Sequence, residues 1–285
     1  MKKKPRVIAV VVTYNRLPLL KRVVSSLNQQ SYRPSTIVVV DNASTDGTEE
    51  WAREEAERGQ LTYLRLPTNT GGAGGFHFGM QYAYSKSCDF VWLLDDDAVP
   101  EERCLETLLK SAALTGGLCL FPKVLFPDGR VDVRSIPRRN FYPGKIYMKK
   151  EIPPLHGAPT LVSIGTFVGA LIRREAMEMV GFPIKEFFLW FDDIEYTYRI
   201  SRRGPVYFVP EAIVYHHTRA GKPDKIKLYY MMRNWSYLAC RKGKAPAFIA
   251  PVLLAAGIIK WKAFRRDMVF SAIKGIIDGT RGELQ

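Results

Sequence analysis

Three consecutive carboxylates, Asp95-Asp96-Asp97, directly follow the apolar run Phe90 to Leu94. Adjacent carboxylates at the end of a buried strand repel one another strongly unless a positive charge lies between them. Their hard oxygen atoms favour Mg²⁺ or Mn²⁺, which complete their ligand shell with phosphate oxygens and water. The run therefore predicts a divalent cation that holds a phosphate group. The alternative is an acidic start for the helix after Pro100, because a helix N-terminus stabilises acids.

A glycine-rich segment, Asn69 to Gly75, precedes another predicted helix. Glycine occupies four of the five positions from Gly71 to Gly75, so the backbone can approach a ligand closely and helix N-terminal amides can face an anion. The spacing differs from the G-x-G-x-x-G fingerprint and lacks the lysine and serine of a P-loop. We expect a contact with a sugar or a phosphate here. The alternative is a tight turn without a ligand.

Two further acids, Asp192 and Asp193, begin a predicted helix from Phe191 to about Arg202. An acid at the positive end of a helix can stay ionised and accept a proton from a hydroxyl group. Glu195 and Arg199 are four residues apart, a spacing typical of a structural ion pair. Helical periodicity separates an outer group of side chains from a group that we expect to pack inward. The outer group is Asp192, Glu195, Tyr196 and Arg199, and the inward group is Ile194, Tyr198 and Ser201.

Two histidines, His216 and His217, follow the apolar residues 212–215. Neutral imidazole is a common metal ligand. Successive side chains of a strand point to opposite faces, so only one of the two can face a site at the end of this segment. A histidine that is hydrogen-bonded for structural reasons is the alternative.

Predicted strands and helices alternate along the sequence between these candidate residues. Continuous β-branched runs, typical of strands covered on both faces, alternate with helical patterns as far as Leu94. This order predicts an α/β fold with an open, parallel sheet, in which ligands bind beyond the carboxyl ends of the strands. The predicted strands are 7–12, 36–40, 61–66 and 90–94, and the predicted helices are 17–29, 48–58 and 73–85. Residues 121–159 are expected to form a long connection that borders the site, followed by ordered structure over 161–173 and a strand at 206–209.

The composition fits one large domain with an appendage. The chain has 285 residues, 47% of them hydrophobic and 25% charged, and its four cysteines form no C-x-x-C pair, which excludes disorder and a disulfide scaffold. The net charge of +14 attracts phosphates. It leaves a nucleic-acid-binding protein as an alternative, although acidic strand ends repel nucleic acid. No run reaches the roughly 20 apolar residues of a transmembrane helix, so we expect a cytoplasmic protein.

The segment 222–285 differs in composition from the domain 1–221. It contains 13 basic and 4 acidic residues, together with apolar stretches such as Val252 to Leu254. We expect a helical extension whose basic amphipathic surface attaches peripherally to anionic lipid at the inner face of the cell membrane. The alternatives are an oligomer contact and a helical cap on the domain 1–221.

Six motifs together resemble the inverting family-two glycosyltransferases of the GT-A fold. They are Val12-Thr-Tyr-Asn-Arg16, Val40-Asp-Asn42, Asn69-x-Gly-Gly-Ala-Gly-Gly75, Asp95-Asp-Asp97, Phe191-Asp-Asp-Ile-Glu195 and His216. The set covers residues 7 to 220, and Tyr229 to Asn234 is also similar to the C-terminal region of such enzymes. Within the family, the motifs look most like those of bacterial galactofuranosyltransferases, with rhamnosyltransferases next.

The resemblance implies a role for each candidate residue. Asp193 corresponds to the catalytic base, with Asp192 as the alternative if the register differs by one. Trp190 and Phe191 would border the acceptor. The implied ligands of Mn²⁺ or Mg²⁺ are Asp95, Asp97 and His216, with the choice between His216 and His217 left open. The implied contacts of the nucleotide-sugar are Thr13, Asn15, Arg16, Asp41, Asn69, Gly72, Gly74, Gly75, Asp95 and Asp96.

The implied reaction is a metal-assisted single displacement with inversion. The acceptor hydroxyl loses its proton to Asp193 and attacks the anomeric carbon from the face opposite the nucleotide. The expected donor is UDP-galactofuranose, with dTDP-rhamnose as the alternative, and the acceptor is a glycan or lipid-linked hydroxyl in cell-surface polysaccharide synthesis. A nucleotidyltransferase of the same fold usually has a glycine-rich loop with a basic residue after the first strand, where this chain has Thr13 to Arg16.

Overall fold

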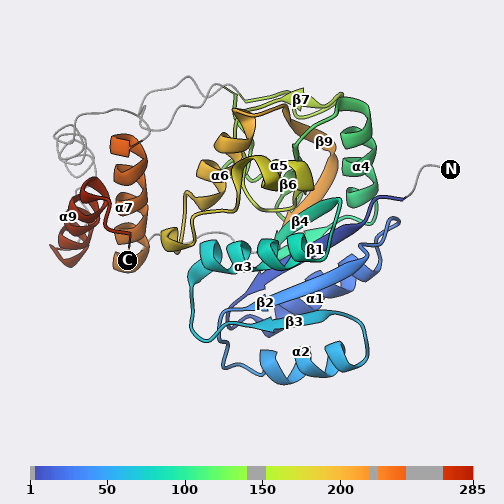
Figure 1. Ribbon diagram of the computed structural model, residues 1–285, viewed down its shortest axis with the longest axis horizontal. Helices are drawn as coiled ribbons and strands as arrows, with labels where there is room; N and C mark the ends of the chain where they lie inside the picture. The colour runs from blue at the N-terminus through green and yellow to red at the C-terminus, as the bar shows by residue number, and fades with distance from the viewer. Residues whose placement is uncertain (1–3, 140–151, 218–223, 242–265, 285) are drawn as a thin grey trace.

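The computed structural model describes residues 4–139, 152–217, 224–241 and 266–284 (Figure 1). Its centre is a nine-stranded mixed sheet in the order β3-β2-β1-β4-β8-β6-β9-β5, with β7 paired to β9. Helices flank this sheet, and helices α7 and α9 lie together at one side of it (Figure 1). The predicted α/β class, a central sheet flanked by helices, is confirmed. The sheet is less parallel than predicted, because the strands after β4 add antiparallel pairs.

The first half of the chain forms the parallel half of the sheet. Strand β1 (Val7–Thr13) pairs in parallel with β2 (Thr36–Asp41) and β4 (Phe90–Asp95), and β2 pairs in parallel with β3 (Thr62–Arg65). The helices between them are α1 (Leu17–Asn28), α2 (Thr48–Glu57) and α3 (Gly71–Ser85). Every strand and helix predicted as far as Leu94 is therefore confirmed, because each has a local pattern of its own.

The part of the chain after Asp95 adds antiparallel pairs. Strand β8 (Ala170–Arg173) is antiparallel to β4 and to β6 (Cys119–Leu125), whereas β9 (Val206–His216) is parallel to β6. The short strands β5 (Ala98–Pro100) and β7 (Thr160–Leu161) are antiparallel to β9. The helical elements are α4 (Cys104–Thr115), α5 (Arg174–Val180), the 3₁₀ turn η1 (Lys185–Phe187) and α6 (Asp192–Ser201).

Two predicted boundaries in this part of the chain are wrong. Residues 121–125 belong to strand β6 rather than to a connection, because the pairing with β9 shifts between Pro122 and Lys123 and so accommodates the proline. Strand β9 does not end at Val209 but continues to His216. This longer strand carries His216 to the edge of the sheet where the acidic residues lie.

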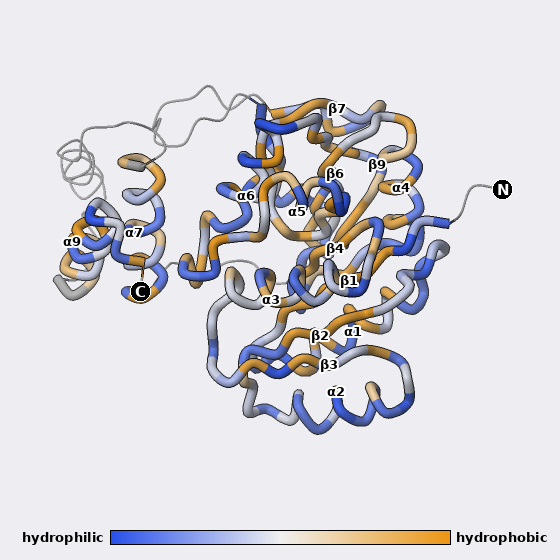
Figure 2. The backbone as a smooth tube through the Cα atoms, viewed as in Figure 1, coloured by the Kyte–Doolittle hydropathy of each residue, from blue (hydrophilic) through white to orange (hydrophobic). Residues whose placement is uncertain are grey.

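Alternate residues of β1 fill two hydrophobic cores, one on each face of the sheet. Val7, Ala9 and Val11 pack with helices α1 and α4, whereas Ile8 and Val10 pack with α3, α5 and α6. Figure 2 shows the hydrophobic central strands between helices that carry many hydrophilic positions. Coverage on both faces explains why these strands are continuous apolar runs.

Two glycines allow helix α3 to lie close to the sheet. A Cβ atom at Gly75 would be 2.4 Å from Cγ1 of Val12, and a Cβ atom at Gly79 would be 2.4 Å from Cγ1 of Val10. Neither distance is tolerable for a carbon contact. The absence of side chains at these positions therefore brings the N-terminus of α3 to the carboxyl end of β1.

Helices α7 (Lys225–Arg241) and α9 (Arg266–Arg281) pack against each other. Their shared core contains Leu228, Ala272 and Ile276. A Cβ atom at Gly279 would be 2.1 Å from the carbonyl oxygen of Arg233, so glycine permits this close contact. The apolar stretch around Val252 to Leu254 lies outside the described residues. In the four described ranges, no helix has the length and apolar character needed to span a bilayer.

Candidate active site

The carboxyl ends of β1, β2 and β4 meet at one edge of the sheet. Val12 of β1 pairs with Asp95 of β4, and Thr13 pairs with Asp41 of β2. Strand β9 brings His216 to the start of β5, where it pairs with Ala98. The structure thus places side chains from four strands near the end of β4, which is the usual position of a ligand site in such sheets.

Arg16 connects the loop after β1 to the acidic residues after β4. Its Nη1 atom donates hydrogen bonds to Oδ2 of Asp97 at 2.8 Å and to Oδ1 of Asp96 at 3.3 Å. The hydroxyl of Thr13 donates to Oδ2 of Asp96 at 2.9 Å. Both acids are buried, and one guanidinium faces two carboxylates. Arg16 therefore offsets part of their mutual repulsion.

His216, and not His217, faces the acidic residues. Its Nε2 atom lies 3.2 Å from Oδ1 of Asp97, and its Nδ1 atom lies 3.1 Å from Oδ2 of Asp132. Burial by itself would lower the pKa of His216, but the hydrogen bonds to Asp132 and Asp97 outweigh it and raise the pKa to about 10. The sequence leaves open which of the two histidines faces the site. In the structure it is the side chain of His216 that contacts Asp97.

Asp132 is a site residue that sequence reasoning missed. It is buried, and burial would raise its pKa, but hydrogen bonds from His216, the amide of Arg134 and the hydroxyl of Ser135 lower the pKa to about 2. The carboxylate therefore stays ionised and holds the imidazole of His216 from the side opposite Asp97. Asp132 follows β6 in the segment predicted as a connection, where no local pattern marks it.

The charges of the acids after β4 and at the start of helix α6 both act on Asp95. Burial, followed by the charge of Asp97, raises the pKa of Asp95 to about 7, although His216 acts in the opposite direction. The charge of Asp193 on α6 adds to the same shift. Burial also raises the pKa of Asp96 to about 6 against the effect of Arg16. We call the group Asp95, Asp96, Asp97 and His216 the acidic corner. This corner contains more negative charge than its basic neighbours offset.

Asp192 and Asp193 begin helix α6, but they differ in exposure. Asp192 is buried, and burial and the charge of Asp193 raise its pKa well above the usual value. Asp193 is only partly buried, and its Oδ1 atom accepts a hydrogen bond from the amide of Ile194 at 2.7 Å. Burial raises the pKa of Asp193 to about 6 despite this bond. Of the two acids, Asp193 is the more accessible to a second molecule.

The predicted orientation of helix α6 is wrong. The side with Glu195 and Tyr196 is buried, whereas Ile194 and Tyr198 are only partly buried. Two pairings make the polar side tolerable in the interior. Arg199 Nε binds Glu195 Oε1 at 2.8 Å, and the hydroxyl of Tyr196 donates to the carbonyl of Gly181 at 2.9 Å. The i, i+4 ion pair predicted as structural support is therefore confirmed.

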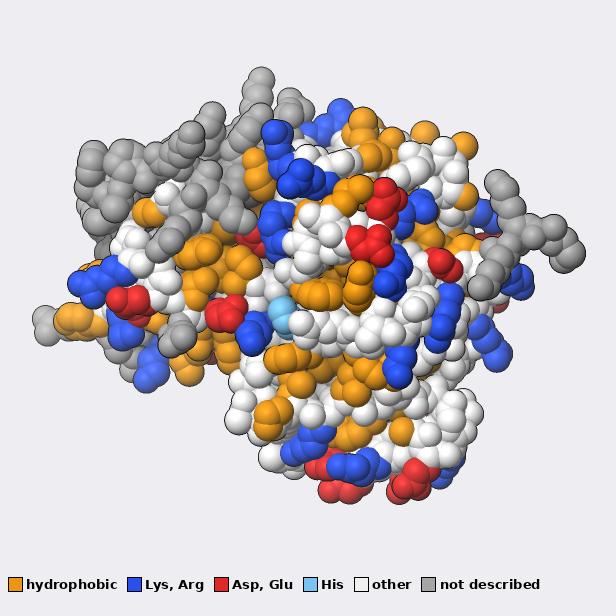
Figure 3. All heavy atoms as spheres, viewed as in Figure 1, with side chains coloured by type: hydrophobic (Ala, Val, Ile, Leu, Met, Phe, Trp, Pro, Cys, Tyr) orange, Lys and Arg blue, Asp and Glu red, His pale blue; other side chains and the backbone are white. Residues whose placement is uncertain are grey.

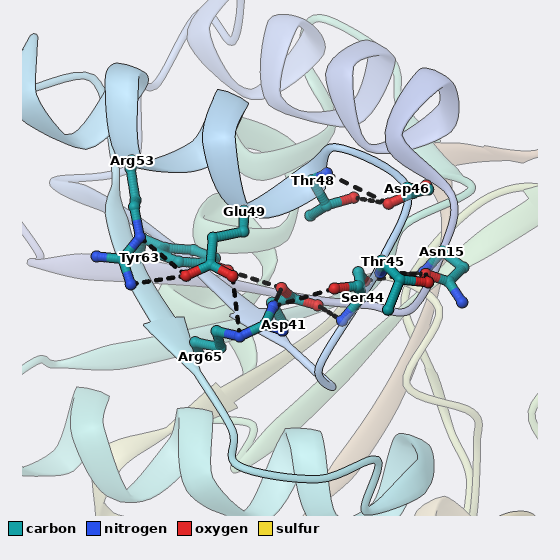
Figure 4. A network of polar contacts seen from close by, with 10 residues as sticks. All are labelled: Asn15, Asp41, Ser44, Thr45, Asp46, Thr48, Glu49, Arg53, Tyr63 and Arg65. Atoms are coloured by element: carbon teal, nitrogen blue, oxygen red, sulfur yellow. Dashed lines mark hydrogen bonds and ion pairs between the residues drawn. The ribbon is translucent and has the colours of Figure 1, made fainter.

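Asp41 lies in a network of polar contacts after β2 (Figure 4). Its side chain is fully buried, and its carboxylate accepts hydrogen bonds from Ser44 N at 2.9 Å, Tyr63 Oη at 2.7 Å and Arg65 Nη1 at 2.9 Å. Asn15, with a positive φ of 53°, joins the same region through Ser44. The predicted contacts of Asp41 and Asn15 with a nucleotide stay predictions, since the described contacts of Asp41 are internal to the protein.

The glycine-rich segment serves packing at most of its positions. A Cβ atom at Gly71 would be 2.0 Å from the carbonyl oxygen of Phe188, and one at Gly74 would be 2.2 Å from Oγ1 of Thr70. Only at Gly72, among the glycines of this segment, would a Cβ atom meet nothing within 4 Å. Asn69 Oδ1 accepts a hydrogen bond from the amide of Gly71 at 2.8 Å and shapes the turn. Gly72 is thus the one glycine of this segment that has open space beside it, and its contact with a ligand stays a prediction.

The two predicted acceptor-contacting residues immediately precede α6. Trp190 and Phe191 have positive φ angles of 70° and 68°, and both are partly buried. Left-handed backbone is unfavourable for bulky side chains. Such conformations gather at functional sites, where the surrounding structure enforces them. The segment lies beside Asp193, so the proposed acceptor contact and the proposed base are adjacent.

The donor types at the acidic corner fit a divalent cation, but their contacts are those of an ion-pair network. Two carboxylates, Asp95 and Asp97, and the imidazole of His216 are ligands that Mn²⁺ accepts. However, the part of the chain that the structure describes contains no group of three His, Cys, Asp or Glu side chains arranged to hold a metal ion. The assignment of these three residues as metal ligands therefore stays a prediction.

Comparisons with known proteins give the family. The sequence model of the family described as Glycosyl transferase family 2 matches residues 8–181. Galactofuranosyltransferase GlfT1 of Mycolicibacterium smegmatis is 29% identical over 255 residues, which cover 83% of this chain and 84% of that protein. GlfT1 of Mycobacterium tuberculosis is 34% identical over 70% of this chain and 65% of its own length. The N-acetylglucosaminyl-diphospho-decaprenol L-rhamnosyltransferase of M. tuberculosis is 26% identical over 73% of this chain and 75% of its own length.

Solved structures share the fold. GalNAc-T7 with UDP, GalNAc and Mn²⁺ superposes with a TM-score of 0.63 and 17% identity, over 82% of this chain and 48% of that one. S. aureus TarS 1-349 with UDP-GlcNAc has a TM-score of 0.62 and 16% identity, over 98% of this chain and 82% of that one. The family match supports the glycosyltransferase interpretation of the sequence. The chain is therefore a glycosyltransferase that belongs to glycosyl transferase family 2 and has the GT-A fold.

Proposed function

We propose that this glycosyltransferase moves galactofuranose from UDP-galactofuranose to a hydroxyl of a glycan or lipid-linked acceptor, in cell-surface polysaccharide synthesis. The similarity to two galactofuranosyltransferases over most of the chain supports the donor sugar. One observation carries the proposal: the segment before Asp193 packs on the start of α3, where the amide of Ala73 donates to the carbonyl oxygen of Phe188 at 3.2 Å. Gly75 of the same helix lies against Val12, the β1 partner of Asp95, so the start of α6 lies toward the edge of the sheet that carries Asp95. A base and a diphosphate-binding group that lie near each other can act on the bond that forms and on the bond that breaks at the same anomeric carbon.

In this proposal Asp193 is the general base. Its partly exposed carboxylate takes the proton of the acceptor hydroxyl, whose oxygen attacks the anomeric carbon from the face opposite the diphosphate. The bond from the anomeric carbon to the diphosphate breaks in the same step, so the configuration inverts and no covalent enzyme intermediate forms. Asp192 supports the helix start from the interior, and Trp190 and Phe191 border the acceptor.

A divalent cation completes the proposed site. Mn²⁺ or Mg²⁺ would be held by Asp95, Asp97 and His216, and it would supply charge stabilisation to the departing diphosphate. The chemistry of these donors and the raised pKa of Asp95, which a nearby cation would lower, support the assignment. Asp132 would orient His216 through Nδ1 and leave Nε2 toward the metal side.

The nucleotide-sugar would lie along the edge formed by β1, β2 and α3. Thr13, Asn15, Arg16 and the Asp41 network would contain the nucleoside, and the open backbone at Gly72 would face the diphosphate or the sugar. The other proposed contacts in this region are Asn69, Gly74, Gly75 and Asp96. Arg16 is 44% exposed and supplies a positive charge beside Asp96 and Asp97, which suits it to a phosphate oxygen.

The donor is tested with a panel of nucleotide-sugars. The protein is incubated with manganese and, in turn, UDP-galactofuranose, UDP-galactose, UDP-GlcNAc and dTDP-rhamnose, and the released nucleoside diphosphate is recorded. We expect UDP release to be fastest from UDP-galactofuranose. The second candidate is a rhamnosyltransferase, which the 26% identical relative favours. Preferential release of dTDP from dTDP-rhamnose would replace the first proposal with the second.

We also propose that the extension attaches peripherally to anionic lipid. Helix α9 exposes Phe270, Ile273 and Ile277 at helical spacing, with exposed fractions of 71%, 43% and 42%. Hydrophobic, basic and acidic side chains mix over α7 and α9 on the face seen in Figure 3. An apolar stripe next to basic residues binds anionic membranes, because apolar burial and charge attraction add.

The proposed attachment predicts co-sedimentation with anionic vesicles but not with neutral ones. We expect Phe270→Ser to weaken binding to phosphatidylglycerol vesicles about tenfold, since one buried aromatic side chain contributes that much. Leu114→Ser is the matched control, because Leu114 is 81% exposed but lies on α4. Equal sedimentation of wild type and the Phe270→Ser variant would assign the stripe on α9 to another role.

A further inference from the structure

The five residues before the catalytic helix, 187–191, have an unusual backbone. Phe188, Trp190 and Phe191 all have positive φ angles, of 59°, 70° and 68°. Non-glycine residues rarely adopt this conformation, and bulky residues least of all. The chain keeps such a conformation only where its surroundings impose it. This segment leads directly into Asp192 and Asp193, so whatever imposes its conformation also sets where the two carboxylates lie.

One side chain from helix α7 holds three carbonyl groups of this segment. The Nδ2 atom of Asn234 donates hydrogen bonds to the carbonyl oxygens of Phe187 at 2.9 Å, Leu189 at 3.0 Å and Trp190 at 2.9 Å. Its Oδ1 atom accepts a hydrogen bond from Nε of Arg233 at 3.1 Å. Asn234 is fully buried. Two amide protons serve three carbonyls, so the segment's turn converges on a single side chain.

Two further contacts with α7 support the segment. The guanidinium of Arg233 donates to the carbonyl oxygen of Glu186, and the ring of Phe188 stacks on that of Tyr230 with centroids 4.5 Å apart. Figure 1 shows α7 next to the turn that precedes α6. Side chains of α7 thus bind backbone carbonyls between residues 186 and 190 and stack on the ring of Phe188.

The N-terminus of α3 holds the segment from the other side. The amide of Ala73 donates to the carbonyl oxygen of Phe188 at 3.2 Å. Gly71 lies so close that a Cβ atom there would be 2.0 Å from the same oxygen. Segment 187–191 is therefore packed between the glycine-rich start of α3 and Asn234 on α7.

We propose that Asn234 is a positioning residue for sugar transfer: it fixes the backbone of residues 187–190 so that Asp193 faces the corner of Asp95. The proposal rests on the proposed function, since it takes Asp193 as the base. The hydrogen bonds of Asn234 reach back 44 to 47 residues in the sequence. Helix α7 then belongs to the catalytic unit, because the base is aligned only when α7 is docked.

The test compares Asn234→Ala with Ser236→Ala in the full chain. Ser236 is a matched control, because it is also fully buried on α7 and its hydroxyl has no hydrogen-bond partner among the described residues. We expect Asn234→Ala to lower kcat for the best donor about 100-fold, as expected for a displaced catalytic group. The KM for the donor and the affinity for UDP should change less than about threefold, because the nucleotide edge is untouched. Ser236→Ala should match wild type in all three quantities.

Hydrogen exchange measured by mass spectrometry supplies a readout that does not depend on catalysis. We expect the peptide covering residues 185–195 to exchange faster in Asn234→Ala, with strands β1 and β4 protected as in wild type. Asn234→Asp keeps the volume but loses both N–H donors, so it should give the same pattern. Its use keeps the test decisive if the alanine variant does not fold.

Each remaining outcome would overturn the proposal. A kcat within threefold of wild type, with faster exchange limited to 185–195, would show that the base does not depend on Asn234. Faster exchange throughout the protein, or failure of both Asn234 variants to fold, would make Asn234 a residue of general stability. If wild type releases no diphosphate from any nucleotide-sugar, the proposed function fails, and an unchanged exchange pattern in Asn234→Ala would separately reject the positioning role.

Discussion

Asp193→Asn should lower kcat for sugar transfer about 10³-fold, within the range that general base catalysis contributes. Asparagine has nearly the same shape as aspartate but cannot accept the proton of an acceptor hydroxyl. The affinity for UDP should stay within about threefold of wild type, because Asp193 acts on the acceptor and not on the nucleotide. Product formation is followed with the best donor of the panel, and UDP binding is measured by titration calorimetry.

Asp192→Asn is the matched control for this variant. Asp192 neighbours Asp193 but is buried, and burial raises its pKa well above the usual value. A hydroxyl from solution therefore has less access to Asp192 than to Asp193. We expect its substitution to reduce kcat less than about tenfold, through the position of the helix start. Loss of transfer in Asp192→Asn, together with retained transfer in Asp193→Asn, would assign the role of base to Asp192.

The rate should also fall as the pH drops below about 6. Burial raises the pKa of Asp193 to about 6, and only the ionised carboxylate accepts a proton. The ionised fraction then decreases about tenfold per pH unit below this value. Rates at saturating manganese between about pH 5 and pH 8 test this, since a carboxylate of ordinary pKa would keep its activity to about pH 4. A flat profile across the range would contradict a base whose pKa is raised to about 6.

Asp97→Ala should abolish metal binding and lower kcat at least about 100-fold. Asp97 contacts both Arg16 and His216, so its removal takes away one proposed ligand and the neighbour of another. A cation at a departing diphosphate stabilises the transition state by several kcal/mol, because it offsets the charge that develops there. Mn²⁺ binding is measured by calorimetry without a nucleotide, and transfer is measured with and without EDTA. Unchanged rate and UDP affinity in EDTA would make the enzyme metal-independent.

The role of Asp132 is tested by comparing the Mn²⁺ affinity of Asp132→Asn with that of a control substitution at Asp128. Asp132→Asn keeps a partner for Nδ1 of His216 but removes its charge, so Mn²⁺ affinity should fall about 10-fold to 100-fold, as for other residues that orient a ligand. Asp128 is exposed and pairs with Arg130, so Asp128→Asn should bind Mn²⁺ as wild type does. Equal effects of the two substitutions would contradict the proposed role of Asp132 in orienting His216.

The parallel half of the fold could be predicted because its signals are local. Residues such as Val7 to Val12 form a strand that is covered on both faces, and such strands are continuous apolar runs. The acids after β4 could be singled out for the same reason, since the polar residues begin where the run ends. The position of ligand sites beyond parallel strands then places Asp95 and Asp41 at one edge.

The errors lie where packing overrides a local pattern. Helix α6 buries Glu195 and Tyr196 because Arg199 and a backbone carbonyl satisfy them, and helical periodicity does not contain this information. The glycines of α3 also show a packing role that the pattern does not record, since a Cβ atom at Gly75 would be 2.4 Å from Cγ1 of Val12. Pro122 did not end strand β6 because a register shift accommodates it.

The sequence alone determined the order of strands and helices in the first half, the family and the chemical types at the site, because each of these depends on residues close together in the chain. Only the tertiary structure decided which histidine faces Asp97, which acid is accessible and which partners hold them. Asp132 reaches His216 across 84 residues and Asn234 reaches Trp190 across 44. Such contacts depend on how β9 and α7 are placed in the fold, and no local pattern of side chains records that placement.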